Sequence, residues 1–187
     1  MKGITTMNNN YKPYQSSYWS NQPMYNDYNS YQYPCWNNSP IDYSNFPKPL
    51  IKIKDYGPKP YVVNIEEATK QNNTFRTALW TGEYLQLTLM SINVRDDIGL
   101  EVHHDHDQFI RIEEGQGIVK MGDEKNKLDF QENIYDDYAI FIPAGKWHNL
   151  INTGYKPLKL YSIYAPPEHP HGTVHKTKED AENYHKF

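Results

Sequence analysis

Three histidines and their acidic neighbours crowd into one short stretch, Glu101 to Gln108, which reads Glu-Val-His-His-Asp-His-Asp-Gln. In an extended chain alternate side chains share a face, so Glu101 and His103 point to one side while Val102 and His104 point to the other. Imidazole nitrogens and carboxylate oxygens are common ligands of divalent transition metals. Glu101 and His103 therefore lie together on one side of the chain as candidates for chemistry that uses carboxylate and imidazole groups.

A second stretch with similar potential runs from Pro143 to Asn152 and contains His148. In an extended segment His148 shares a face with Leu150, so its ring should point inward. Gln108 shares a face with the two isoleucines that follow it at alternate positions, and it should also point inward. We therefore expect the chemistry of this chain where the two stretches meet.

The residues around both stretches follow the two-residue period of β-strands. Short apolar or alternating runs are separated by turns rich in Gly and Asp, and we expect strands at 74–80, 85–90, 108–113, 117–121, 128–131, 139–142, 147–151 and 158–164. Helical signals are few: a brief helix after Asn64, which can cap with Glu67, and a C-terminal helix from Thr177. About eight or nine short strands with few helices predict an all-β antiparallel sandwich or barrel.

Residues 1–46 differ in composition from the rest of the chain. They are rich in Tyr, Asn, Ser, Gln and Pro and nearly lack branched aliphatic residues. Such a segment buries too little apolar surface to offset the entropy of ordering, so we predict a disordered tail. Its tyrosines, set among Asn and Gln, favour self-association, and a passive extension is the alternative. Residues 47–187 then form one folded domain, with the proline-rich segment 165–175 as an extended strap.

At these stretches the sequence resembles the cupin superfamily, whose members carry two short motifs. The second motif is Gly, five residues, Pro-x-Gly, two residues, His, three residues, Asn. This sequence matches it from Pro143 through Gly145 and His148 to Asn152, with Asp137 in place of the leading Gly. The resemblance implies a jelly-roll-like barrel, the cupin double-stranded β-helix.

The first cupin motif, Gly, five residues, His-x-His, three or four residues, Glu, six residues, Gly, is matched in spacing only. Glu101 replaces the first His, Gln108 replaces the Glu, and Arg95 replaces the first Gly. The resemblance implies a site for one divalent transition metal (Mn, Fe, Ni, Co or Zn) with these ligands: Glu101, His103, Gln108 and His148. The alternative pair, His104 and His106, lies on the opposite face and breaks the spacing to Gln108. A further alternative is a pocket without metal, in which these side chains are only hydrogen bonded.

Other residues are candidates for binding a substrate or for shaping its pocket. Anionic or hydroxylated groups could be bound by three strand residues: Arg76, Arg111 and Tyr161. Cross-strand pairing is the alternative explanation for all three. We expect an apolar base of the pocket, formed by Leu85, Leu87, Ile110, Ile112 and Leu150. We expect the remaining histidines of this region and of the strap at the surface: His104, His106, His169 and His175.

Composition and charge exclude several classes of partner. The chain has 19 basic and 23 acidic residues, a net charge of -4 and no Lys/Arg cluster, which disfavours nucleic acid and anionic membranes as partners. No apolar run approaches the ~18 residues of a membrane span. The single cysteine, Cys35, excludes an internal disulfide and a Cys-rich zinc site. We expect a cytoplasmic location, with the spore coat as the alternative.

The cupin resemblance leads to our expectation of function. We expect a metal-dependent enzyme of isomerase or lyase type acting on a small polar, carbohydrate-like molecule, with Glu101 as ligand or, if left unbound, as general base. The resemblance also implies a homodimer. One alternative is a structural or assembly protein, because the tail resembles those of spore-coat proteins. Another is a dioxygenase.

Overall fold

The computed structural model describes residues 48–184. The predictions for the tail, for its boundary at residue 46 and for Cys35 lie outside the described residues. Within them the chain forms two antiparallel sheets and two short helices, which confirms the predicted all-β fold. The helices are α1 (Ile65–Gln71) and α2 (Lys178–Tyr184).

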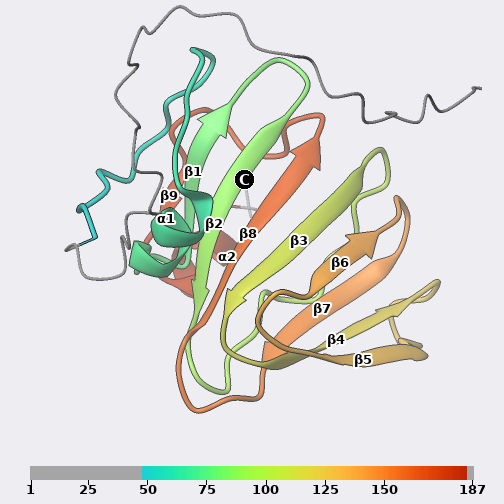
Figure 1. Ribbon diagram of the computed structural model, residues 1–187. Coiled ribbons are helices and arrows are strands. Elements are labelled where there is room, and N and C mark those ends of the chain that lie inside the picture. The colour runs from blue at the N-terminus through green and yellow to red at the C-terminus, as the bar shows by residue number, and fades with distance from the viewer. Residues whose placement is uncertain (1–47, 185–187) are drawn as a thin grey trace, which may run out of the picture. The chain divides into compact units, whose positions relative to one another are not determined.

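The larger sheet has six strands in the order β6, β3, β8, β2, β1, β9 (Figure 1). Their bounds are β1 Arg76–Thr81, β2 Gln86–Ile92, β3 Asp107–Glu114, β6 Ala139–Ile142, β8 Leu158–Ala165 and β9 Val174–His175. The smaller sheet has three strands in the order β5 (Phe130–Ile134), β4 (Gly117–Gly122) and β7 (Trp147–Asn152). All of the predicted strands are present with shifted ends, and β9 is a short addition at the end of the predicted strap.

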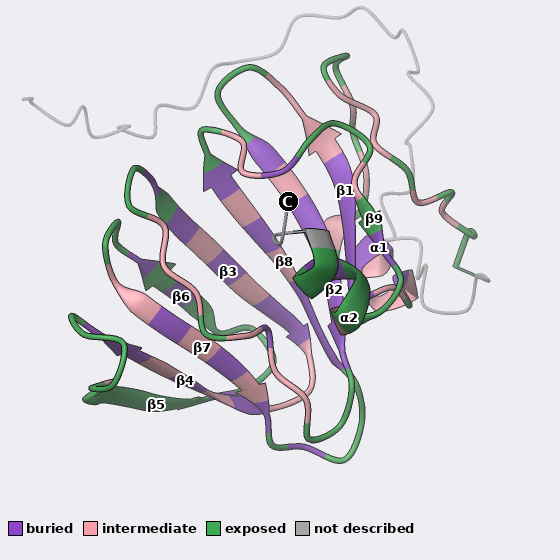
Figure 2. Cartoon of the chain, turned by 180° about the vertical axis from the view of Figure 1, so that it is seen from behind, coloured by how far each residue is buried: buried purple, intermediate pink, exposed green. Residues whose placement is uncertain are grey.

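The main core draws its apolar residues from both sheets. Burial alternates along β3 and β8, as the purple and pink bands in Figure 2 show, because successive strand residues point to opposite faces. Most of its members are branched aliphatic side chains, among them Ile92, Ile110, Ile112, Ile142, Leu150, Leu158 and Leu160. Alternation therefore carries Gln108 and His148, both buried, into the interior with these residues.

The prediction that Leu85 and Leu87 line the base of the pocket is wrong. Leu87 packs against a second apolar cluster, formed by Ala68 of α1, Leu79 and Leu89, and Leu85 is exposed. This cluster covers the outer face of the six-stranded sheet. Because that sheet is buried on both faces, the alternation of Leu and polar residues in β2 does not reveal which face is interior.

Both helix starts follow the predicted capping chemistry. The Asn64 side chain accepts a hydrogen bond from the Glu67 backbone N–H at 3.1 Å, as a residue preceding a helix does. At α2, Asp180 accepts from the backbone N–H of Thr177 at 3.1 Å, and Ala181 is buried in the main core. Neither helix of residues 48–184 is both long and apolar enough to cross a membrane.

Candidate metal centre

Glu101 and His148 are held together by an antiparallel backbone bridge. The Glu101 N–H donates to the His148 carbonyl at 3.1 Å, and the His148 N–H donates to the Glu101 carbonyl at 2.9 Å. Residues that exchange such a pair of bonds place their side chains on the same face. His103 follows Glu101 by two residues, and its carbonyl accepts from the Gly145 N–H at 2.6 Å. The two motif stretches therefore bring these three side chains together.

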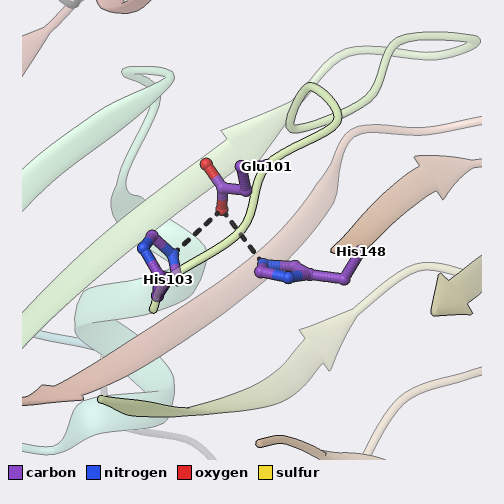
Figure 3. A group of neighbouring side chains, drawn as sticks. All are labelled: Glu101, His103 and His148. Carbon is purple, nitrogen blue, oxygen red and sulfur yellow. Dashed lines mark ion pairs between the residues drawn. The ribbon is translucent and has the colours of Figure 1, made fainter. Parts of the chain in front are cut away.

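The Glu101 carboxylate lies between the two imidazole rings (Figure 3). Its Oε1 is 3.3 Å from His148 Nε2 and 3.6 Å from His103 Nε2. All three atoms are buried and lack a hydrogen-bond partner among the described residues. Two ligand atoms held about 2.1 Å from one ion are about 3 to 3.6 Å apart at coordination angles of about 90° to 120°. The group is therefore spaced to bind one ion.

The proton on His148 can be placed from its backbone contact. Its Nδ1 is 2.9 Å from the carbonyl oxygen of Lys146. A carbonyl can only accept, so Nδ1 carries a proton, and in the neutral form of the ring Nε2 presents its lone pair to Glu101. A lone pair and a carboxylate that face each other at this distance favour a cation between them.

The charges of the group support this arrangement. Burial disfavours the charged form of Glu101, but its contacts with His103 and His148 and the nearby Arg76 outweigh burial and hold the pKa of Glu101 well below its ordinary value. Burial also disfavours the charged form of His103, but the Glu101 and Glu168 carboxylates outweigh it and raise the pKa of His103. Glu101 is therefore an anion at neutral pH, the form in which a carboxylate binds a metal.

Gln108, the fourth predicted ligand, lies in the interior with its amide nitrogen already engaged. Its Nε2 donates to Ser162 Oγ at 2.9 Å and to Tyr164 Oη at 3.2 Å. Its Oε1 is buried without a hydrogen-bond partner, and the Tyr164 ring lies 5.7 Å from the His103 ring. An amide oxygen is thus free to bind an ion, and the role of Gln108 as ligand stays a prediction.

The predicted surface position of three histidines is wrong. His106, His169 and His175 are each only 6% exposed, whereas His104 is exposed as expected. The His106 ring stacks on that of His103, with ring centres 4.6 Å apart. The alternation of faces does not predict the orientation of His106, because residues 102–106 are not in a strand. The His106 side chain can therefore turn inward although its neighbours are acidic.

Glu168 is the residue near the centre that sequence reasoning missed. Its two carboxylate oxygens lie 3.7 Å from His103 Nδ1 and 3.4 Å from His106 Nε2, which makes a second group able to hold an ion. Glu168 belongs to the strap 165–175, far from the motifs in sequence. Only the three-dimensional path of the strap brings it beside His103.

The three predicted substrate-binding residues separate in the structure. Arg76 is buried and lines a cavity next to Glu101. Arg111 and Tyr161 are directly paired between β3 and β8, on the face opposite to Gln108. There Arg111 contacts Asp137 at 2.7 Å, so the structure does not bring it or Tyr161 to the centre.

The cavity beside the centre has a volume of about 510 Å³. Its wall is formed by β1, by the segment before β3, by the strap and by α2, and the polar lining residues are Arg76, Glu101, His103, Glu168, His169, Lys178 and Glu182. Its size lies within the roughly 300 to 1,000 Å³ of small-molecule sites. Glu101 and His103 therefore contact both the candidate ion position and a space that a small molecule can enter.

Comparison with known proteins agrees with this architecture. The family model described as "Cupin domain" matches residues 88–164, which include both motif stretches. The uncharacterized protein YrkC of Bacillus subtilis is 70% identical over 129 residues, 69% of each chain. The uncharacterized protein L612 of Acanthamoeba polyphaga mimivirus is 44% identical over 115 residues, 61% of this chain and 70% of that protein.

Solved structures of other proteins share this fold. BH2720 from Bacillus halodurans superimposes with a TM-score of 0.70 at 64% identity, covering 70% of this chain and 99% of that one. An uncharacterized protein with a double-stranded β-helix domain from Klebsiella pneumoniae shares the fold alone, with a TM-score of 0.50 at 13% identity, over 64% of this chain and 100% of that one. By its domain match and its fold, the chain belongs to the cupin superfamily.

Proposed function

We propose that this chain is a metal-dependent enzyme acting on a small polar molecule, with one divalent transition metal held by Glu101, His103, Gln108 and His148. The observation that supports this most strongly is the convergence of unpartnered ligand atoms: Glu101 Oε1, His103 Nε2 and His148 Nε2 are buried, face one another and donate or accept no hydrogen bond among the described residues. Buried polar atoms without a partner are rare in native proteins unless an ion, water or ligand satisfies them.

The surrounding residues fit a reaction of isomerase or lyase type on a carbohydrate-like substrate. A divalent ion bound there supplies Lewis acidity that polarises a carbonyl or hydroxyl oxygen. Glu101 lines the cavity, so a Glu101 carboxylate that does not bind the ion is placed to accept a proton from a substrate. Burial raises the pKa of Tyr164, so its hydroxyl keeps its proton beside Gln108. Glu101 thus lines the cavity, and the proton-bearing Tyr164 lies beside the centre, with its ring 5.7 Å from that of His103.

Metal content tests the first part of this proposal. We expect the purified protein to hold about one Mn, Fe, Ni, Co or Zn ion per chain, measured by elemental mass spectrometry. His148→Ala should lose nearly all of it, because the remaining ligands no longer enclose the ion. His104→Ala is the matched control, since His104 is exposed and close in sequence. Equal metal content in the two variants would refute the ligand assignment.

Proton exchange tests the second part. Sugars and hydroxy acids incubated with the metal-loaded protein in heavy water should exchange a carbon-bound proton for deuterium, which NMR detects without knowledge of the final product. Exchange should disappear in Glu101→Gln, which keeps the side-chain shape but removes the base. A metal-loaded protein that exchanges no proton in any of these compounds would contradict the enzyme proposal.

A further inference from the structure

We infer that the substrate carries a small oxyanion group, a carboxylate or a phosphate, and that Arg76 binds this group inside the cavity. The inference rests on the proposed function, because it names the class of molecule that the centre acts on. The observation behind it is the position of one buried cation, the guanidinium of Arg76.

Arg76 is held in the wall of the cavity by its strand. It is the first residue of β1, opposite Met90 of β2 and His175 of β9, and it is only 2% exposed. Its guanidinium carbon lies 5.7 Å from the centre of the Phe75 ring, close enough for the ring to attract the cation. The side chain is therefore confined to the cavity wall, away from bulk water.

This buried guanidinium forms no direct ion pair. None of the ion pairs among residues 48–184 includes Arg76, and its buried Nε donates no hydrogen bond within that range. The Glu101 carboxylate attracts it only without direct contact, and a buried cation that lacks a direct partner is costly, because the hydration it has lost is not replaced. An anionic ligand in the cavity would supply the missing partner.

The other charged groups of the cavity are already engaged or exposed. Lys178 contacts Asp96 at 3.1 Å and Asp97 at 3.0 Å. The Glu168 carboxylate faces His103 and His106. With a divalent ion offsetting the charge of Glu101, Arg76 is the cation left in the lining of the cavity to attract a ligand.

The arrangement suits a molecule held at two points. A guanidinium binds carboxylate and phosphate with two parallel hydrogen bonds, which fixes their orientation as well as their position. If Arg76 holds the oxyanion, a hydroxyl or carbonyl elsewhere in the same small molecule can reach the centre at Glu101, on the same cavity wall. A neutral molecule of equal size lacks the first of these anchors.

The small number of arginines makes a direct test practical. The sequence contains three arginines, Arg76, Arg95 and Arg111. Their Nε–H groups therefore give three resolvable NMR signals. The full chain loaded with Zn(II), and the same chain treated with EDTA, would each be titrated with sodium glycolate, ethylene glycol and inorganic phosphate. We expect glycolate or phosphate to shift the Arg76 signal and leave that of Arg111 unchanged, and ethylene glycol to shift neither.

Variants then measure the contribution of the side chain. Glycolate should bind the zinc-loaded Arg76→Met protein at least about tenfold more weakly, the effect expected when a charge-assisted hydrogen bond is lost. Arg111→Met is the control and should keep the affinity. If Arg76→Met fails to fold, the titration of the unaltered chain decides alone. A preference of phosphate over glycolate would identify a phosphorylated substrate, and the reverse a carboxylic acid.

Two outcomes separate this inference from the proposed function. An Arg76 signal that does not move with either anion, in a protein that does bind zinc, would overturn the oxyanion site and leave the metal centre intact. A shift of the Arg76 signal in a protein that binds no zinc would support the oxyanion site and contradict the metal-dependent function.

Discussion

Asn152 closes the second motif, yet its contacts belong to the backbone rather than to the metal centre. Its amide nitrogen donates to the carbonyl oxygens of Ile92 at 3.0 Å and Lys156 at 2.9 Å, and its amide oxygen accepts from the Gly154 N–H at 2.8 Å. The side chain is 1% exposed. It therefore joins the end of β2 to the turn between β7 and β8. Motif residues thus divide into those that face the candidate ion and those that hold the strands that carry them.

We expect Asn152→Ala to lower the free energy of unfolding by about 3 kcal/mol, because two buried backbone groups and one part-buried backbone group lose their partner. Urea denaturation measures this. Asn149→Ala, in the same strand, should cost less than about 1 kcal/mol, because its side-chain oxygen makes no hydrogen bond among residues 48–184. Both variants should retain the metal. Loss of metal in Asn152→Ala with unchanged stability would show that the residue serves the centre instead.

At the scale of elements, one carboxylate connects three segments. Asp55 accepts hydrogen bonds from Gly57 N at 2.9 Å and Thr81 N at 3.0 Å through one oxygen, and from Thr81 Oγ1 at 2.6 Å and Gly172 N at 2.9 Å through the other. The segment before α1, the end of β1 and the strap therefore meet at Asp55. Since the strap also carries Glu168, this contact helps to position the wall of the cavity.

We expect the contribution of Asp55 to depend on pH. Burial disfavours its charge, but the hydrogen bonds from Thr81, Gly172 and Gly57 outweigh burial and lower its pKa below the ordinary 3.8. A carboxylate with a lowered pKa stabilises the folded state above its unfolded pKa, and this stabilisation is lost as the pH falls through the folded pKa. Asp55→Asn should therefore cost on the order of 2 kcal/mol at pH 7, and the difference from the unaltered chain should shrink below about pH 4.

Urea denaturation of both proteins at pH 7 and at pH 3 measures that difference. Asp129→Asn serves as control, because the Asp129 side chain is 66% exposed and its Lys127 contact is 3.8 Å long. A difference for Asp55→Asn that stays constant with pH would show that the charge of Asp55 is not what connects the segments.

The strands could be predicted from sequence, and the faces of some could not. Alternation placed Gln108 and His148 inside, because β3 and β7 continue through buried aliphatic residues on one side. In β2 both faces are buried, so the alternation is compatible with either face pointing to the pocket. Leu87 in fact packs against the second apolar cluster. A two-residue period of apolar side chains identifies a strand. Which face of the strand points to the core can be predicted only when the other face is polar.

The candidate centre was predictable to the extent that it lies in regular backbone. Glu101, His103 and His148 were brought together by motif spacing, and the structure joins them through a backbone bridge. His106 and Glu168 were not predictable, since neither lies in a strand. Their positions depend on how an irregular segment and the strap pack, which no local periodicity records.

At the scale of the whole domain, the large sheet acts as a central layer. Its inner face packs on the main core with the small sheet, and its outer face is covered by α1 and apolar residues from 51 to 65. The segment before β3 bridges to β7 of the small sheet, and Glu101 and His148 meet at that bridge. The centre therefore depends on the two sheets keeping their relative position, which the shared core provides.

This organisation leads to an expectation for residues 1–46. Residues 1–46 contain almost no branched aliphatic side chains, which are the main material of the domain core, so their composition offers little to add to it. A chain that begins at Pro47 should therefore melt within about 3 °C of the full chain, which corresponds to less than about 1 kcal/mol for a domain of this size. Differential scanning calorimetry measures this, and metal content measured on both chains should agree. Sedimentation velocity on the same pair tests whether the tyrosine-rich segment drives self-association, which should then be confined to the full chain. A melting temperature lowered by more than about 10 °C would mean that residues 1–46 stabilise the domain by several kcal/mol, and the boundary predicted at residue 46 would have to be abandoned.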